Sequence, residues 1–247
     1  MANLLRTSNP ALNERAFKGQ VAFGEAMTLQ GTVNKTGLLL LFVVVTAAWT
    51  WGLSHSGTPE AAIPWMVGGI FGGFIVALVT IFKKEWSPLT APIYALLEGL
   101  ALGGISAMFE LRYPGIAIQA VGLTFGTLFV MLLAYKSGVI RATQGFKVGV
   151  IAATGGIAVL YLVDMVLHFF NRPVAFIHQS GPWGIAFSLF VVVIAALNLV
   201  LDFDLIETGV NNGAAKYMEW YGAFGLMVTL IWLYLEILRL LGKARRR

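Results

Sequence analysis

Residues 183–207 read WGIAFSLFVVVIAALNLVLDFDLIE, a stretch that carries no charged side chain before Asp202. About 20 apolar residues let a helix cross roughly 30 Å of hydrocarbon, so this stretch predicts a membrane-spanning helix. Three carboxylates, Asp202, Asp204 and Glu207, crowd its end. A carboxylate near hydrocarbon costs about 2.5–3.5 kcal/mol on insertion scales, so such a cluster is expected to face a cavity, a cation or a proton path.

The composition places the whole chain in a membrane. Of its 247 residues, 58% are hydrophobic and 12% are charged, and the mean hydropathy is +0.79. These values are typical of an integral membrane protein and exclude an ordinary soluble domain. We therefore predict an all-α fold, a bundle of seven transmembrane helices. The predicted spans cover residues 36–54, 62–82, 89–109, 115–135, 147–169, 183–205 and 219–241.

These spans define the expected domain organisation. A cytosolic N-terminal tail covers residues 1–35, the transmembrane domain covers residues 36–242, and a basic C-terminal tail covers residues 243–247. The N-terminal tail has no short apolar core and no cleavage site of small residues, so it does not resemble a signal peptide.

The distribution of Lys and Arg predicts the orientation. With the N-terminus inside, the outer loops hold only Arg112 and Arg172, and loops 83–88, 136–146 and 206–218 are cytoplasmic by the positive-inside rule. The inner side then holds Arg6, Arg15, Lys18, Lys35, Lys83, Lys84, Lys136, Arg141, Lys147 and Lys216. Seven crossings would put the basic C-terminal tail outside, against this rule. We still expect seven, because residues 219–241 are long and apolar enough to span; the alternative is an incomplete last crossing.

Several kinds of chemistry lack the residues they need. The chain has no cysteine, which excludes disulfides and thiolate chemistry. His55, His168 and His178 lack metal-ligand spacing, and no metalloprotease or serine hydrolase motif occurs. The net charge of +5 comes from residues beside the spans rather than from one patch, which favours lipid headgroups over nucleic acid. We expect neither an enzyme nor a cofactor.

Small residues in the second and third spans predict close helix packing. They follow small-xxx-small patterns that let helix backbones approach each other. No strand precedes them and no Lys-Ser/Thr follows, so they are not phosphate loops. The residues are Gly68, Gly69, Gly72, Gly73, Gly99, Gly103 and Gly104.

Three segments resemble the Bax inhibitor-1 family. They are Leu201-Asp-Phe-Asp-Leu-Ile206, the last span from Leu226 to Gly242 with its basic tail, and the segment from Ala91 to Ser106. The segment from Ala91 to Ser106 is similar to bacterial relatives that have a longer N-terminal tail. The resemblance implies a bundle in which the last helix is central and the other six surround it. It also implies a bacterial plasma membrane location and a pH-sensitive calcium leak.

The resemblance further implies a proton-sharing pair of aspartates in the sixth and seventh spans. The first matches Asp202 through the shared Asp-Phe-x-x-Ile pattern. The second does not transfer, because the Leu-Arg-x-x-Gly ending aligns it with Thr229 and the Leu-Tyr-Leu-acid pattern aligns it with Glu236. This chain has therefore either lost the second aspartate of the pair or carries the second carboxylate at another position.

Helix geometry predicts a replacement for this pair. If the turn after the sixth span is centred near residue 211 or 212, Asp204 lies level with Glu219 and Glu207 lies level with Lys216. Two facing carboxylates in a low-dielectric site hold a proton or a cation between them. Asn198, one turn before Asp202, could supply a further oxygen to calcium. The alternative is that these acids are solvated, with Glu207 paired to Lys216.

Four further charged residues are candidates for an ion path. Glu98 lies near the middle of the third span, where it must be protonated or paired. Asp164 and Glu236 lie nearer the outer end, and Arg239 is an ion-pair partner for Glu236 one turn away.

The resulting hypothesis is a pH-sensitive cation leak channel or transporter, gated by buried carboxylates, with Asp202 and Asp204 as calcium ligands. Calcium is then the transported or bound ion and membrane lipids are the other partners. The alternative is a non-transporting membrane regulator that binds a protease or a stress-response partner.

Overall fold

Seven long helices form in the part of the chain that the computed structural model describes, residues 25–56, 59–170, 174, 177 and 179–246. All seven are long and apolar enough to cross a membrane, which confirms the predicted all-α fold with seven spans. Short 3-10 turns at Pro59–Ala62 and Lys84–Trp86 precede the second and third of them. The helices are α2 (Leu29–His55), α3 (Ile63–Phe82), α4 (Ser87–Arg112), α5 (Ile116–Lys136), α6 (Gln144–Phe169), α8 (Pro182–Asn211) and α9 (Met218–Ala244).

The first helix begins earlier than its apolar run. Residues 29–35, assigned to the tail by hydropathy, are helical because the Thr28 hydroxyl accepts the Gly31 amide at 3.0 Å and caps α2. Residues 1–24 of the predicted tail, including Arg6, Arg15 and Lys18, lie outside the described residues, as do Arg172 and His178.

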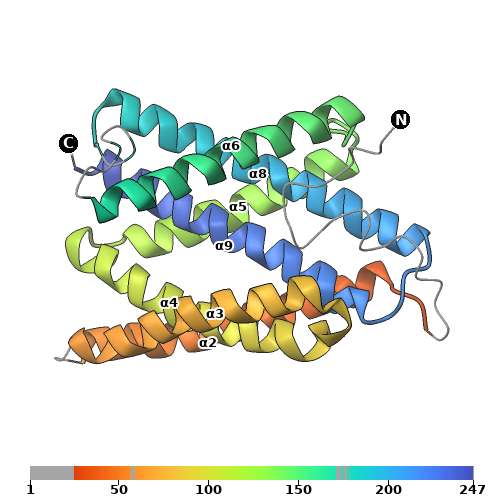
Figure 1. The fold of residues 1–247 in the computed structure, drawn as a ribbon, viewed down its shortest axis with the longest axis horizontal. Coiled ribbons are helices and arrows are strands. Elements are labelled where there is room, and N and C mark those ends of the chain that lie inside the picture. Colours follow the sequence, from red (N-terminus) through yellow and green to blue (C-terminus); the bar gives the residue numbers. More distant parts are fainter. Residues whose placement is uncertain (1–24, 57–58, 171–173, 175–176, 178, 247) are drawn as a thin grey trace.

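The last helix lies at the centre of the bundle. Figure 1 shows α9 passing obliquely between a group formed by α2, α3 and α4 and a group formed by α5, α6 and α8. It packs directly against α2, α4, α5 and α8. The most apolar 18-residue window of α9 is 67% buried, compared with 17% in α3 and 11% in α6, which lie at the periphery. The structure therefore confirms that the last helix is central.

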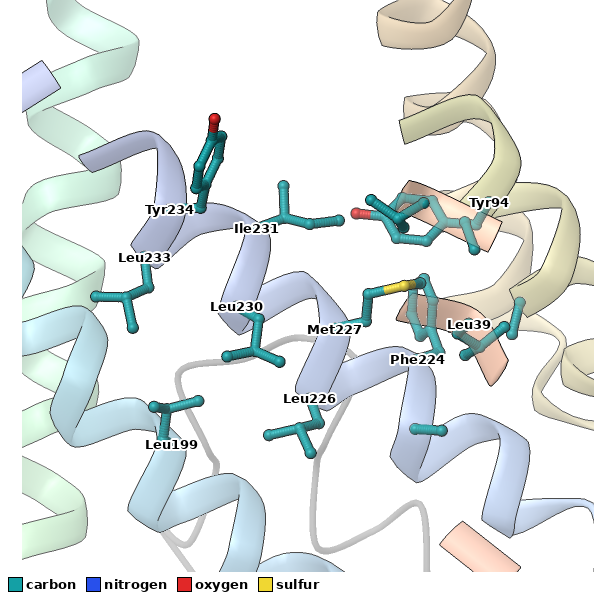
Figure 2. Packing of buried hydrophobic residues seen from close by; sticks show 14 of the residues in the cluster. Leu39, Tyr94, Leu199, Phe224, Leu226, Met227, Leu230, Ile231, Leu233 and Tyr234 are labelled. Carbon is teal, nitrogen blue, oxygen red and sulfur yellow. The ribbon is translucent and has the colours of Figure 1, made fainter. Parts of the chain in front are cut away.

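Apolar side chains of α9 pack in two directions. Leu226, Leu230 and Leu233 point toward Leu199 of α8, whereas Phe224 packs against α4 (Figure 2). The Phe224 and Tyr94 rings meet edge to face with centroids 4.9 Å apart. Because lipid tails are as apolar as leucine, these helices associate through van der Waals packing rather than through removal of apolar surface from water.

Five of the seven predicted packing glycines lie in contacts that leave no room for a side chain. A Cβ at Gly99 or Gly103 would collide with α2, at the backbone of Val43 or Ala47. On α3, a Cβ at Gly69 would lie 2.5 Å from the Leu97 oxygen. Gly73 lies against Glu98 and Gly104 against Met66. A Cβ at Gly72 would lie 3.3 Å from Leu97, a tight contact in which the Leu97 side chain must shift slightly. A Cβ at Gly68 would meet nothing within 4 Å, so the prediction is wrong for Gly68.

The two ends of the bundle are held by polar contacts between distant segments. At one end, here called the Thr28 end, Ser87 Oγ donates to the main-chain carbonyl oxygen of Tyr217 at 3.0 Å, and the Thr28 hydroxyl donates to Glu219 of α9. At the other, here called the Lys243 end, Lys243 Nζ donates to Ser188 Oγ at 2.7 Å and Arg245 donates to the Pro114 oxygen at 2.7 Å. Helix α9 thus runs from one end to the other, which favours seven complete crossings.

Candidate functional site

Asp202 is the most deeply buried acid of the sixth span. It lies on α8 and has 0% exposure, and Leu201 and Leu205 of the same helix are also buried. Asn198, one turn earlier, is also buried, and its Nδ2 donates to Thr154 Oγ1 of α6 and to the Ile194 oxygen, both at 2.8 Å. The bond to Thr154 connects α8 to α6, whereas the bond to Ile194 lies within α8.

The predicted facing pair of Asp204 and Glu219 does not form. Helix α8 continues to Asn211, through the residues taken as a turn, so the connection to α9 covers residues 212–217. Its centre lies between Ala214 and Ala215, about three residues later than predicted. Asp204 is therefore about six residues deeper than Glu219, or roughly 9 Å at 1.5 Å per residue.

Asp204 and Glu207 each contact a residue on a different neighbouring helix. Asp204 Oδ2 pairs with Lys147 Nζ of α6 at 2.5 Å. Glu207 Oε2 accepts the Tyr135 hydroxyl of α5 at 2.5 Å, so the alternative pairing of Glu207 with Lys216 is not formed either. Lys147 and Tyr135 carried no signal in the sequence, because they lie 57 and 72 residues away from the acids they contact.

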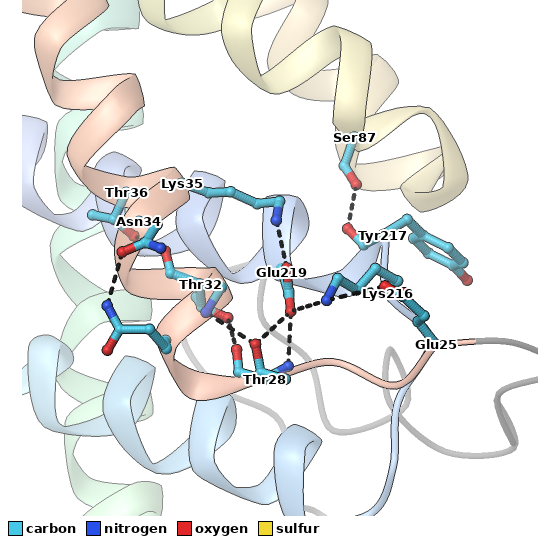
Figure 3. A network of polar contacts seen from close by, with 12 residues as sticks. Glu25, Thr28, Thr32, Asn34, Lys35, Thr36, Ser87, Lys216, Tyr217 and Glu219 are labelled. Carbon is cyan, nitrogen blue, oxygen red and sulfur yellow. Dashed lines mark hydrogen bonds and ion pairs between the residues drawn. The ribbon is translucent and has the colours of Figure 1, made fainter.

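Glu219 is the centre of a polar network at the Thr28 end. Its side chain has 0% exposure, and Oε1 accepts both the amide and the hydroxyl of Thr28, each at 2.8 Å. Lys35 of α2 pairs with Oε2, and Lys216 lies 3.4 Å from Oε1 (Figure 3). The hydrogen bond to Glu219 is the first cause that raises the pKa of Lys216 above its usual value, so Lys216 stays cationic at neutral pH.

Glu98 lies on α4 and lines a cavity between α3, α4 and α9. The cavity measures about 480 Å³, and Glu98 and Tyr94 are the two polar residues among its lining residues. The Tyr94 side chain, one turn earlier on α4, interacts with the Glu98 carboxylate. The carboxylate fits against α3 because Gly73 has no side chain there.

The acids near the Lys243 end form separate contacts. Glu236 Oε1 pairs with Arg239 Nη1 at 2.7 Å, as predicted, and also accepts the Tyr161 hydroxyl of α6 at 3.0 Å. Glu236 Oε2 is buried and accepts no hydrogen bond from the described residues. Asp164 Oδ1 accepts the Val174 amide at 2.8 Å and so fastens the segment that follows α6.

The register of α8 and α9 shows which of the two positions aligned with the second family aspartate, Thr229 or Glu236, lies nearer Asp202. A Cβ at Gly222 would lie 3.3 Å from Ile206, so these two residues are level and Asp202 is level with about residue 226. Thr229 is buried and lies about three residues further along, roughly 4.5 Å in depth. Glu236 lies about ten residues away, or roughly 15 Å. Of the two aligned positions, Thr229 is the one near Asp202.

A ready-made metal site is absent from the residues that the structure describes. In these ranges no group of three or more His, Asp or Glu side chains is placed to hold an ion. The predicted ligands Asp202 and Asp204 are separated by their helix, because residues two apart lie roughly 200° around it and Asp204 is bound to Lys147.

Comparison with known families agrees with the fold. The family model described as Bax inhibitor 1 like matches residues 9–246, nearly the whole chain. The chain belongs to the Bax inhibitor 1 like family. The match includes all seven helices of this Bax inhibitor 1 like protein and the residues just before α2. No curated protein and no solved structure matches the chain.

Proposed function

We propose that this Bax inhibitor 1 like protein is a pH-sensitive cation leak, with calcium as its cargo and Asp202 as the carboxylate that senses protons. The observation that carries the proposal is the burial of Asp202, at 0% exposure, beside the central helix of a seven-span bundle. An ionised carboxylate is expensive in that environment, so it must hold either a proton or a positive charge. Competition between the two makes cation passage depend on pH.

Glu98 supports the same proposal from the other group of helices. Because α4 and α9 run parallel, the contacts Ser87–Tyr217 and Ser106–Tyr234 place Glu98 level with about residue 227 of α9. Asp202 is level with about residue 226 across the α8–α9 contact. The two carboxylates therefore stand at a similar depth, one approaching the central helix from α4 and one from α8. We propose that they belong to one cation path, with the cavity beside Glu98 as its widest part.

The orientation belongs to the proposal. The Thr28 end carries Lys35, Lys147 and Lys216, and the positive-inside rule places it in the cytoplasm. We propose the plasma membrane of a bacterium, with the N-terminus inside, as the setting in which this leak acts. Asp204, Glu207 and Glu219, each bound to a neighbouring helix at this end, would stabilise the inner mouth rather than bind the passing ion.

Calcium flux in proteoliposomes tests the proposal. Purified protein is reconstituted with a calcium-sensitive dye inside, and uptake is followed across pH 5 to 8. The proposal expects flux that varies with pH in the native chain and loses its pH response in Asp202→Asn. A chain that passes no calcium at any pH would instead favour the non-transporting regulator of a protease or stress complex.

A further inference from the structure

A short segment before the first helix crosses the Thr28 end of the bundle. Residues 25–28, here called the strap, run antiparallel to the α8–α9 connection. Ala26 and Ala215 form an antiparallel bridge, and the Met27 amide donates to the Ala214 oxygen at 2.7 Å. The strap thus makes backbone contacts with the α8–α9 connection, which lies 187 to 189 residues further along the chain.

The strap inserts one side chain into the bundle. Met27 is 2% exposed and belongs to the main apolar core. Its Cε lies 3.6 Å from the point that a Cβ of Gly222 would occupy, next to Ile206 of α8. Ile206 is one turn from Asp202 on the same face of α8, about 6 Å in depth. Met27 therefore lies buried at the level of Ile206, one turn nearer the Thr28 end than Asp202.

Glu219 fastens the strap from the side. The carboxylate accepts two hydrogen bonds from Thr28, the last strap residue, and pairs with Lys35, about two helical turns further on. It is buried, so its charge depends on these partners and on Lys216. Loss of the Thr28 contacts leaves a buried carboxylate with fewer donors, which makes the fastened state the stable one.

We propose that the strap is a removable inner seal over the Asp202 site and that Glu219 is the latch that holds it closed. This inference rests on the proposed cation path for its effect on flux, but the seal itself is a property of the fold. When the strap lifts, Met27 leaves its place beside Ile206 and Gly222, and water and cations gain access to Asp202 from the Thr28 end. When the strap is fastened, that entrance is closed.

Because the native chain has no cysteine, a single introduced thiol reports on the strap. In Met27→Cys the thiol is buried while the strap is fastened, and it reacts with a membrane-impermeant maleimide when the strap lifts. Gly31→Ala should raise the labelling rate, because its Cβ would collide with the Glu219 carboxylate. Gly37→Ala is the matched control on the same helix, since its Cβ would meet nothing within 4 Å.

We expect Gly31→Ala to label about tenfold faster than the parent, the ratio for a loss of roughly 1.4 kcal/mol in opening free energy. Gly37→Ala should label at the parental rate. Equal rates in all three chains, or a parental thiol that reacts as fast as a free one, would overturn the seal.

A reversible cross-link connects the seal to flux and does not depend on weakening the fold. Opposed residues of an antiparallel bridge have Cα atoms about 4.5–5.5 Å apart, inside the range that a disulfide accepts. Ala26→Cys with Ala215→Cys should therefore form a bond under oxidising conditions and lock the strap. We expect calcium flux to fall at least about fivefold on oxidation and to return with reductant. In each single-cysteine variant, neither oxidant nor reductant should change the flux.

The two assays separate the seal from the proposed function. Flux that is equal in the locked and reduced chains refutes the seal and leaves the cation path standing. If Gly31→Ala raises the labelling rate but the chain passes no calcium at any pH, the cation path is refuted. The strap is then a mobile lid over a site of another kind.

Discussion

Arg239 Nη1 lies 2.7 Å from Glu236 Oε1, one turn away on the central helix, and the Tyr161 hydroxyl of α6 reaches the same oxygen. The Arg239 side chain is 41% exposed, whereas that of Glu236 is 2% exposed. The pair therefore brings a buried acid into contact with a cation that stays in touch with the surface. It fastens the peripheral helix α6 to the Lys243 half of α9.

Removal of the Arg239 charge alone should lower the unfolding free energy more than removal of the charges of both Arg239 and Glu236. Arg239→Gln leaves Glu236 buried without its cation, and we expect a loss of about 3 kcal/mol in unfolding free energy, the low end of the range for a broken buried pair because Arg239 is partly exposed. Adding Glu236→Gln should restore at least half of that loss. Unfolding in detergent measures the cycle, and additive losses would contradict the pairing.

The two adjacent glycines of α3 provide a matched test of helix packing. Gly69→Ala places a methyl group 2.5 Å from the Leu97 oxygen and 2.8 Å from the Ala101 nitrogen, and overpacking of this kind costs about 1–3 kcal/mol. Gly68→Ala meets nothing and should be neutral or slightly stabilising. Melting temperatures of the two purified variants decide the matter. A similar loss in both would mean that α3 does not pack on α4 through Gly69.

The structure predicts that the turn before α4 and the end of α9 face opposite sides of the membrane. Arg245 lies against Pro114 and Gln119 at the Lys243 end, away from the Thr28 end. Single cysteines at Glu85 and at Arg246 should therefore react with an impermeant maleimide from opposite sides of sealed vesicles. Glu60→Cys, at the turn before α3, should react from the same side as Arg246→Cys. Labelling of all three from one side would rule out seven complete crossings.

Much of the fold could be predicted from the sequence, because hydropathy is a local property. The seven spans agree with the seven helices, and α2 and α8 differ most: α2 begins at Leu29 rather than at residue 36, and α8 extends from its predicted end at residue 205 to Asn211. That extension has a physical cause: Asp202, Asp204 and Glu207 lower the hydropathy of the last turns, but a helix continues as long as its polar groups find partners. Hydropathy measures burial in lipid, not helix length.

The candidate site could be predicted only in part. The position of Asp202 and the pair of Glu236 with Arg239 followed from local spacing. The partners of Glu219 could not be predicted, because Thr28 and Lys35 come from a segment 191 and 184 residues earlier and neither residue is unusual in its own sequence context. The Thr28 cap and the polar start of α2 were the available signal, and they indicate a helix start rather than a latch.

The behaviour of Asp202 and Asp204 separates a proton sensor from a structural ion pair. Asp204→Asn should loosen α6 from α8, because Lys147 loses its carboxylate, and it should leave the pH dependence of flux in place. A shift of the pH midpoint in Asp204→Asn that equals the shift in Asp202→Asn would show that the two acids act as one site. Flux and melting temperature measured on the same preparations supply both readouts.

The central claim is that a proton on Asp202 controls the passage of cations. The most direct measurement is the pH dependence of calcium uptake by proteoliposomes holding either the native chain or Asp202→Asn at equal protein content. Uptake that changes with pH in the native chain and is constant across the same range in Asp202→Asn is the predicted result. The same pH curve in both chains would contradict the claim.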